Sequence, residues 1–254
     1  MASDSVAPSL LGPSEPSPVG VVNEKGAAAH KLLLIGDHAG RRVPAALGDL
    51  GVPTADYERH IAWDIGIRAL GEALAARLDV PFVHQLYSRL VIDCNRSPER
   101  ADAMPEVSDG TPVPGNVGLS AAARAARVAA IHAPYQAAIG ARLGSETVLV
   151  SLHSFTPQLR GGGLRPWQVG LLHDRGNTAF TQAVLAGLRA PGDLCVGDNE
   201  PYQMDEIDYS VPRHAYPDRP YAEFEVRQDL IADAAGVAQW CDRLAEVIEG
   251  SLNH

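Results

Sequence analysis

Polar side chains follow four short apolar runs of this sequence, where groups that do chemistry could gather. They are Asp-His after residues 32–36, Asp-Cys-Asn-Arg after residues 90–92, His-Ser after residues 148–152, and Glu-Val-Arg-Gln after residues 221–224. Ligands of open α/β sheets bind at the carboxyl ends of the strands, so polar groups at those ends are candidates for function. Among them, His38, His153 and Glu225 are the first candidates for catalysis or metal binding.

Each of these three residues also has a purely structural interpretation. A histidine at the end of a strand often caps a turn or hydrogen-bonds a carbonyl group, and this applies to both His38 and His153. The alternation of residues 221–226 turns Glu223 and Glu225 to one face of a strand. A carboxylate on a core strand is costly unless it is paired, hydrogen-bonded or bound to a cation. An ion pair with Arg227, on the same face, is the alternative for Glu225.

The elements that must position these residues alternate between strands and helices. Apolar patterns predict strands at 31–36, 89–94, 147–152, 167–173 and 221–226, and helical spacing predicts helices at 64–80, 119–143, 177–189 and 233–252. Ser120 is a candidate N-cap, and Pro134 interrupts or restarts the second of these helices. The alternation predicts one α/β domain with helices on both faces of a central sheet. Residues 94–118 show neither period, and we expect this long loop to be a lid or to contact substrate.

The composition limits the classes of protein to which the chain can belong. With 254 residues, of which 46% are hydrophobic and 20% charged, it can form one large core. Its formal charge of −10 disfavours nucleic-acid binding through a broad basic surface, and an anionic substrate would need clustered arginines. No apolar run approaches the roughly 18 residues of a membrane span, and no export signal is recognisable. Three cysteines without CxxC spacing suit a reducing compartment, so we expect a cytoplasmic protein.

The first residues differ in composition from the rest of the chain. Residues 1–26 are rich in Ser, Pro, Ala and Gly and show neither the helical nor the strand period. Such a segment buries too little apolar area to offset its ordering entropy. We therefore predict a disordered arm at 1–26 and a catalytic domain at 27–254.

Eight short strings, spread in order from about Leu32 to Trp240, resemble the N-formylglutamate amidohydrolase family. They are DHAGRRVP, ERHIAWDIG, YSRLVIDCNR, VSDGTPVPGN, LHSFTP, RPWQVGLL, DNEPY and FEVRQDLI. That family is similar in turn to the zinc carboxypeptidases and aspartoacylases. The resemblance implies a single domain with a mixed central sheet flanked by helices, of zinc-carboxypeptidase-like fold. It also implies a hydrolase in which a metal-bound water attacks an amide.

The resemblance implies one divalent metal ion, for which we expect Zn²⁺, with His38 and His153 as ligands. The zinc carboxypeptidases place a third ligand, a glutamate, three residues after the first histidine, but here that position is Arg41, which cannot ligate. We expect Asp64 instead, with His60 as the alternative if the helix extends back to it. The structural alternative for Asp64 is an N-cap of the helix that follows. Asp37 is a candidate for orienting a metal-bound histidine.

The same resemblance gives roles to the remaining site residues. Glu225 matches the general base, and Asn95 and Arg96 match a pair that holds the substrate carboxylate. Arg89 is expected to polarise the scissile carbonyl, with a surface charge as its alternative. Other candidates for the substrate pocket have alternatives too: Arg165 holds a second carboxylate or stacks on Trp167, and Asn199 and Glu200 line the pocket or form a turn.

Two functions therefore remain open from the sequence. The first is a metal-dependent amidohydrolase that releases the acyl group, formyl by resemblance, from an N-acylated amino acid such as N-formylglutamate. The second is a non-catalytic or metal-free member that binds an anionic metabolite in an arginine-lined pocket, which Arg41 favours. The expected partner is a small molecule in both cases, without nucleic acid or membrane. The sequence leaves the oligomeric state undetermined.

Overall fold

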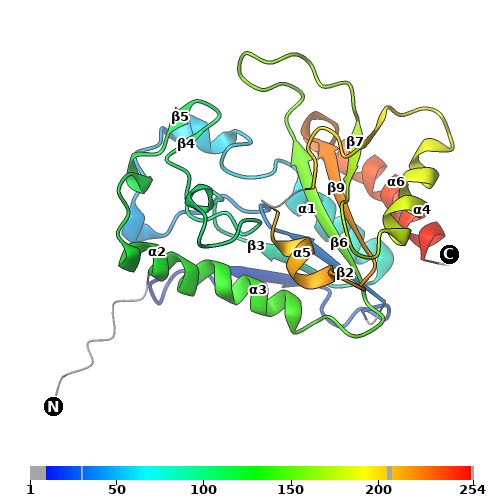
Figure 1. The fold of residues 1–254 in the computed structure, drawn as a ribbon, viewed down its shortest axis with the longest axis horizontal. Coiled ribbons are helices and arrows are strands. Elements are labelled where there is room, and N and C mark those ends of the chain that lie inside the picture. The colour runs from blue at the N-terminus through cyan, green and yellow to red at the C-terminus, as the bar shows by residue number, and fades with distance from the viewer. Residues whose placement is uncertain (1–9, 30, 205–207, 253–254) are drawn as a thin grey trace.

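The computed structural model describes residues 10–29, 31–204 and 208–252, which form one α/β domain around a seven-stranded sheet (Figure 1). The strands lie in the order β1-β3-β2-β6-β9-β7-β8. Strands β2, β3, β6 and β9 run parallel to one another, while β1 is antiparallel to β3 and β7 is antiparallel to β9. The predicted mixed sheet is thus confirmed. The strand bounds are β1 (Val19–Val22), β2 (Leu32–Gly36), β3 (Phe82–Gln85), β6 (Val148–Phe155), β7 (Val169–Leu172), β8 (Val196–Asp198) and β9 (Tyr221–Arg227).

Helices cover both faces of this sheet, as the alternation of elements predicts. On one face, α6 (Ala234–Ser251) contacts both α1 (Ile67–Leu78) and α4 (Ala179–Arg189), and the three helices bury their apolar sides on the strands. On the other face, α3 (Ala133–Gly140) and α5 (Ser210–Ala215) contact the sheet. In β2 the side chains alternate between two hydrophobic cores. Leu32 and Leu34 pack in the core under α1, α4 and α6, and Leu33 and Ile35 pack in the core on the side of α3 and α5. A fully apolar strand therefore serves two cores at once.

The Ala-rich helix is broken where Pro134 predicts a break. The Oγ of Ser120 accepts a hydrogen bond from the N–H of Ala123 at 3.2 Å and caps α2 (Ala121–Arg127). A π-helical turn follows before α3 begins, with Pro134 in the first turn of α3. Because proline lacks an N–H, the helix continues there only by changing its hydrogen-bond pattern.

The prediction of a disordered arm at 1–26 is wrong for its described part, residues 10–26. Strand β1 lies within it and pairs with β3 at the edge of the sheet. The Tyr87 hydroxyl donates to the carbonyl of Pro16 at 3.0 Å, and Glu15 accepts from the N–H of Ala45 at 2.9 Å. An edge strand needs few apolar residues of its own, because its ladder bonds and its neighbour supply the ordering energy. Residues 1–9 lie outside the described residues.

The predicted strand at 89–94 is also wrong, because Leu90 to Cys94 form buried turns instead of a ladder. Side chains satisfy the backbone there: Asn116 donates to the carbonyl of Leu90 at 2.8 Å, and Arg127 donates to that of Val91 at 2.9 Å. A buried irregular segment needs such partners for its carbonyl groups. Its apolar composition alone does not distinguish it from a strand.

Two further features concern the whole described chain. Across residues 10–29, 31–204 and 208–252, no helix has the length and apolar character needed to cross a bilayer. The three cysteines are free, with Cys94 and Cys241 buried and Cys195 exposed.

Candidate active site

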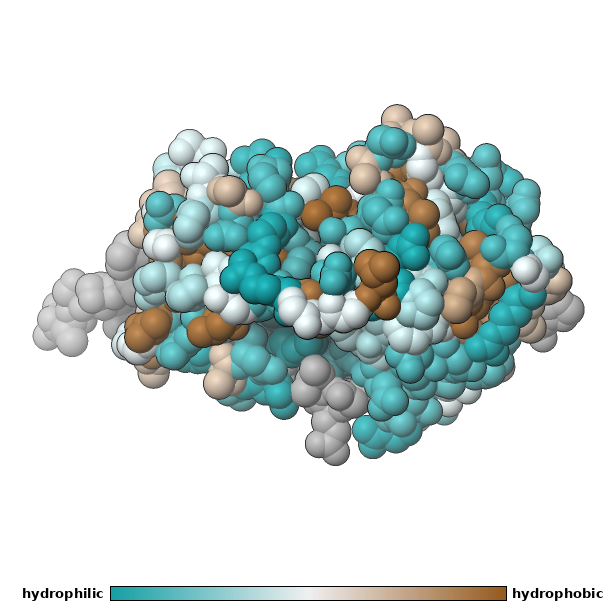
Figure 2. All heavy atoms as spheres, turned by 90° about the horizontal axis from the view of Figure 1, so that it is seen from above, coloured by the Kyte–Doolittle hydropathy of each residue, from teal (hydrophilic) through white to brown (hydrophobic). Residues whose placement is uncertain are grey.

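A cavity of about 450 Å³ opens at the carboxyl ends of β2, β6 and β9. The loop after residue 94, which carries the short hairpin β4 (Val107–Ser108) and β5 (Thr111–Pro112), forms one side of it, and the loop between β6 and β7 forms another (Figure 1). The 94–118 loop supplies Asn95, Arg96, Asp102, Pro105, Ser108 and Asp109 to the cavity wall. The loop therefore lines the cavity, and its contact with a substrate stays a prediction. Figure 2 looks onto the face that these loops form, which is mostly hydrophilic with separate small hydrophobic areas.

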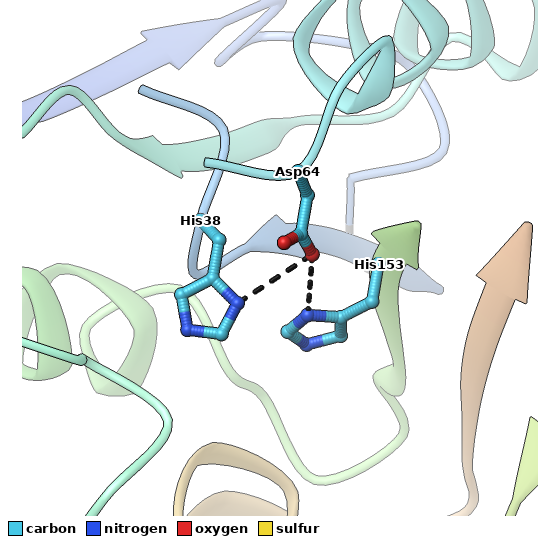
Figure 3. A group of neighbouring side chains, drawn as sticks. All are labelled: His38, Asp64 and His153. Carbon is cyan, nitrogen blue, oxygen red and sulfur yellow. Dashed lines mark hydrogen bonds and ion pairs between the residues drawn. The ribbon is translucent and has the colours of Figure 1, made fainter. Parts of the chain in front are cut away.

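Three residues from three segments point toward one another at the floor of this cavity (Figure 3). His38 follows β2, His153 lies near the end of β6, and Asp64 precedes α1. Asp64 Oδ2 is 3.0 Å from His153 Nδ1 and 3.5 Å from His38 Nδ1. One ligand atom from each residue lies within 4.8 Å of the others, and all three residues are buried. This group could hold a metal ion.

The structural alternative for Asp64 is not observed, since Gly66 occupies the N-cap position of α1. The carboxylate of Asp64 instead accepts a hydrogen bond from the N–H of Ser154 at 3.2 Å. The alternative ligand His60 lies outside the group of three, because α1 begins only at Ile67 and does not extend back to it. Its Nε2 is 3.6 Å from Asp109 at the cavity wall.

Arg41 points away from the group of three. It forms an ion pair with Glu58, and its guanidinium lies 4.9 Å from the ring centre of Trp63. Within the described residues, the carboxylate that meets the two histidines is Asp64. Asp64 lies 23 positions after Arg41 in the chain, and its role as a third ligand stays a prediction.

Each histidine of this group is held from behind by a second carboxylate. Asp93 Oδ1 lies 2.7 Å from His38 Nε2, and Asp37 Oδ2 lies 3.3 Å from His153 Nε2. Asp37 is fixed in turn by the hydroxyls of Ser210 and Ser151. The hydrogen bond from His38 Nε2 to Asp93 sets the tautomer of His38 and leaves its Nδ1 directed at the site, whereas His153 Nε2 makes no hydrogen bond within the described chain. The prediction that Asp37 orients a histidine agrees with this geometry.

Arg89 lies at the cavity wall beside the same group. Its Nη2 and Nε donate to Asp93 Oδ2 at 2.7 and 3.1 Å, and its Nη1 is 3.4 Å from Asp64 Oδ1. It is therefore not a free surface charge. Whether it also polarises a substrate carbonyl stays a prediction.

Burial and charge act in opposite directions on the pKa values of this group. Burial raises the pKa of Asp64, but the imidazoles of His38 and His153 outweigh it and the pKa is lowered. Burial also raises the pKa of Asp93, but the charges of Arg89 and His38 outweigh it and hold this pKa well below its usual range. For His153, burial lowers the pKa and contacts with Asp37 and Asp64 raise it well above its usual value. Without a cation, the cluster is stabilised by protons on its histidines.

The two glutamates of β9 also border the cavity, from the strand next to β6. Glu225 is the register partner of His153 across the two parallel strands. The Oε2 atoms of Glu223 and Glu225 are buried and have no hydrogen-bond partner. Burial raises the pKa of Glu225 to about 8, and it raises that of Glu223 well above the usual range, with Asp208 adding to the effect. The alternative pairing of Glu225 with Arg227 does not occur, since Arg227 pairs with Asp229.

Asn95 and Arg96 both line the cavity. Asn95 Oδ1 accepts from the N–H groups of Tyr209 and Ser210 at 3.0 and 2.9 Å, which ties the loop to α5. Arg96 Nη1 donates to the Asn95 carbonyl and lies 3.5 Å from Asp208 Oδ1. Their role in binding a substrate carboxylate remains a prediction.

Three other predicted pocket residues are not brought into the cavity wall. Asn199 has a φ of +54° and accepts from the N–H of His173 at 2.8 Å, so its side chain holds the end of β8 against β7. Glu200 packs its backbone against Gly170 and Gly197. The prediction that these two line the pocket is therefore wrong, and a turn describes them. Arg165 stacks on a tyrosine and on Phe155 rather than on Trp167.

Two further residues belong to the site that are not among the predicted site residues, Asp93 and Glu223. Asp93 stands in the same Asp-Cys-Asn-Arg string as Asn95 and Arg96 and was not singled out, although an acid beside that pair was a signal. Glu223 lies two residues before Glu225 in β9 and therefore on the same face of the strand, which is the sequence signal for its place in the site.

Comparison with known proteins gives one family and two informative structures. The model of the N-formylglutamate amidohydrolase family matches residues 30–232. The gene product Atu2144 from Agrobacterium tumefaciens is similar in structure, with a TM-score of 0.90, 33% sequence identity, and coverage of 96% of this chain and 98% of that one. The N-formylglutamate amidohydrolase from Ralstonia eutropha JMP134 has a TM-score of 0.66 at 20% identity, covering 93% of this chain and 97% of that one, which shows a shared fold. No curated protein compared with the chain matches it.

Proposed function

Because the chain belongs to the N-formylglutamate amidohydrolase family and is a hydrolase of amide bonds, we propose that it is metal-dependent and removes the formyl group from an N-formylated amino acid such as N-formylglutamate. The observation that carries this proposal is the group of His38, Asp64 and His153 at the floor of a cavity that Glu225 also lines. A cavity of about 450 Å³ has the size of a small-molecule site.

The donor set fits a divalent cation. The Nδ1 of His38 is buried without a hydrogen-bond partner, and Asp64 Oδ2 lies 3.5 Å from it. An orphaned buried nitrogen beside a buried carboxylate is costly unless a cation or proton joins them. Two imidazoles and one carboxylate are a common ligand set of catalytic zinc, which leaves a position open. We therefore assign the ligand role to His38, Asp64 and His153, with Zn²⁺ as the expected ion.

When bound there, a divalent cation lowers the pKa of a water molecule and polarises an amide carbonyl. The residues of the chain supply the remaining steps. Glu225 has a raised pKa because it is buried, so its carboxylate readily takes a proton from water and can pass it to the leaving nitrogen. Asp93 holds the imidazole of His38 in the tautomer that directs Nδ1 at the site, and Asp37 lies at ion-pair distance from His153 Nε2.

Two arginines that line the cavity are the groups expected to hold the substrate. Arg96, supported by Asn95, is placed to receive the carboxylate of the amino acid, since a guanidinium binds a carboxylate through two hydrogen bonds. Arg89 is fixed by Asp93 and Asp64 beside the reacting groups, where its positive charge would favour a polarised carbonyl.

The test combines metal analysis with a substrate screen. Purified protein should contain about one equivalent of a divalent metal per chain and should release formate from N-formyl amino acids, N-formylglutamate among them. N-acetyl and N-carbamoyl amino acids serve as the comparison substrates. Chelation should abolish turnover, and added zinc should restore it. Protein without metal, inert toward all three classes and unresponsive to zinc, would contradict the proposal.

A further inference from the structure

A tyrosine and an arginine form a pair at the cavity that the reaction described above does not use. Tyr202 lines the cavity and is 39% exposed, in a loop between β8 and α5. Arg165 Nη1 donates to the Tyr202 hydroxyl at 3.0 Å and to the carbonyl of Thr156 at 3.2 Å. The guanidinium also lies 4.9 Å from the centre of the tyrosine ring and 5.8 Å from that of Phe155. The tyrosine is thus held from one side by a fixed cation.

This contact determines what the tyrosine hydroxyl can still do. A phenol has one proton to donate and oxygen lone pairs to accept with. The oxygen of Tyr202 already accepts from a cation, and among the described residues no group accepts its proton. A hydroxyl that accepts from a guanidinium is a stronger donor, because hydrogen bonds in series polarise one another. The proton of Tyr202 is therefore available to a ligand in the cavity.

The Tyr202 hydroxyl shares its cavity with the groups proposed to react. Burial is the largest cause that raises the pKa of Tyr202, and the carboxylate of Glu225 is the next. The charges of Arg165 and Arg89 act in the opposite direction. Glu225 and Arg89 line the same cavity as Tyr202, so a ligand in this cavity can meet all three side chains.

We propose that the Tyr202 hydroxyl is a catalytic hydrogen-bond donor to the carbonyl oxygen of the scissile amide, and that Arg165 is its positioning residue. This inference rests on the proposed function. A preorganised donor aimed at an oxygen that becomes negative stabilises the transition state more than the ground state. Arg165 then acts through Tyr202, without holding a second substrate carboxylate.

The chain contains a matched pair outside the cavity wall. Arg213 Nη1 donates to the Tyr209 hydroxyl at 3.0 Å, and its guanidinium lies 5.5 Å from the ring centre. Tyr209 is not among the cavity-lining residues. Tyr209→Phe therefore removes one Arg–Tyr hydrogen bond, as Tyr202→Phe does, but it removes no hydrogen-bond donor from the cavity.

The experiment compares Tyr202→Phe, Arg165→Gln, their double variant and Tyr209→Phe by steady-state kinetics on the best substrate of the screen. Tyr202→Phe should lower kcat by about 100-fold, the effect of one lost oxyanion donor, with KM changed by less than about threefold. Arg165→Gln should lower kcat by about tenfold, and the double variant should be no slower than Tyr202→Phe, because both changes act through one hydroxyl. Tyr209→Phe should stay within about twofold of wild type. Metal content and melting temperature should be unchanged in Tyr202→Phe, which keeps the ring.

The outcomes separate this inference from the function on which it rests. If wild type is active and Tyr202→Phe keeps the wild-type kcat, with or without a higher KM, the hydroxyl does not act in the transition state. The inference is then overturned. Additive losses in the double variant would also overturn it, since Arg165 would then act on its own. If wild type hydrolyses none of the substrates with any metal, the proposed function is wrong and this inference falls with it.

Discussion

The cavity holds two sets of buried carboxylates whose pKa values shift in opposite directions. We call the group of His38, Asp64 and His153 on the cavity floor the first wall, and Glu223 and Glu225 of β9 the second wall. On the first wall, Asp64 touches both histidines, and its pKa is lowered. On the second wall, Glu223 and Glu225 of β9 each have a buried Oε2 without a hydrogen-bond partner, and their pKa values are raised, that of Glu225 to about 8. Burial alone acts in the same direction on all three carboxyl groups.

The difference shows that neighbouring cations determine the direction of the shift. Asp64 lies between two imidazoles and near Arg89, so it stays charged and can bind a cation. Glu225 has His153 across the strand pair, but burial prevails, so a proton binds to it at neutral pH more readily than to an exposed carboxylate. Two carboxyl groups whose environments shift their pKa values in opposite directions can take different roles in one reaction, here as ligand and as general base.

The largest effect is expected when the first wall loses its charge. Asp64→Asn removes one of three proposed ligands and leaves the two imidazoles without their shared anion. We expect metal affinity to fall by more than the roughly 10–100-fold that loss of an outer partner causes, and turnover to fall to background. Competition with a chelating dye and formate release would measure both quantities.

Asp109→Asn is the matched control for this change. Asp109 lines the same cavity and pairs with Arg59, but it is not part of the metal group. It should keep its metal. Equal metal loss in both variants would mean that the negative charge of the cavity as a whole, rather than the group of three, holds the ion.

A substitution in the second wall should lower turnover without lowering metal content. Glu225→Gln keeps the volume of the side chain and removes the proton acceptor, so kcat should fall by about 10²–10⁴-fold. Bound metal should remain at the wild-type level, measured by elemental analysis on the same sample. Loss of metal together with activity would show that Glu225 is a ligand and would remove the distinction between the two walls.

The sequence predicts the parts of this site that local periodicity controls. Apolar runs followed by a polar residue predict the end of β2, after which His38 lies, whereas β6 continues past the predicted end at residue 152 and contains His153. Alternation along β9 gives the face of Glu225. Asp64 could be proposed as a ligand from the family likeness, but only the structure removes its alternative, because an N-cap and a ligand look the same before the helix start is known.

The sequence does not predict contacts that depend on tertiary folding. Asp93 meets His38 from 55 positions away, and no local spacing encodes that contact. Asn199 fails as a pocket residue because its side chain is used by the backbone of His173, 26 positions earlier. Strand β1 was missed for the same reason, since its partner β3 stabilises it rather than its own composition.

Removal of the outer partner of the first wall should have an intermediate effect. Asp93→Asn replaces the carboxylate 2.7 Å from His38 Nε2 with an amide of the same shape. The histidine becomes less basic and less well oriented, so metal affinity should fall by about 10–100-fold while saturating zinc recovers much of the activity. Formate release measured at each concentration of a zinc titration separates the loss of metal affinity from a loss of activity at saturating zinc. Activity that saturating zinc does not recover would assign Asp93 a direct part in the reaction.

The smallest effect concerns the stability of the metal-free protein as a function of pH. Because the pKa of Glu225 is raised from 4.5 to about 8 in the folded chain, its protonated form contributes stability below pH about 4.5 that is lost as the pH rises through about 8. Glu225→Gln stays neutral and avoids this loss. In the presence of chelator, the melting temperatures of variant and wild type should therefore coincide near pH 4.5 and differ by a few degrees in favour of the variant near pH 9. The exposed Glu146→Gln should show no such divergence, and a wild type that gains on the variant as the pH rises would mean that the second wall, like the first, prefers its carboxylates charged.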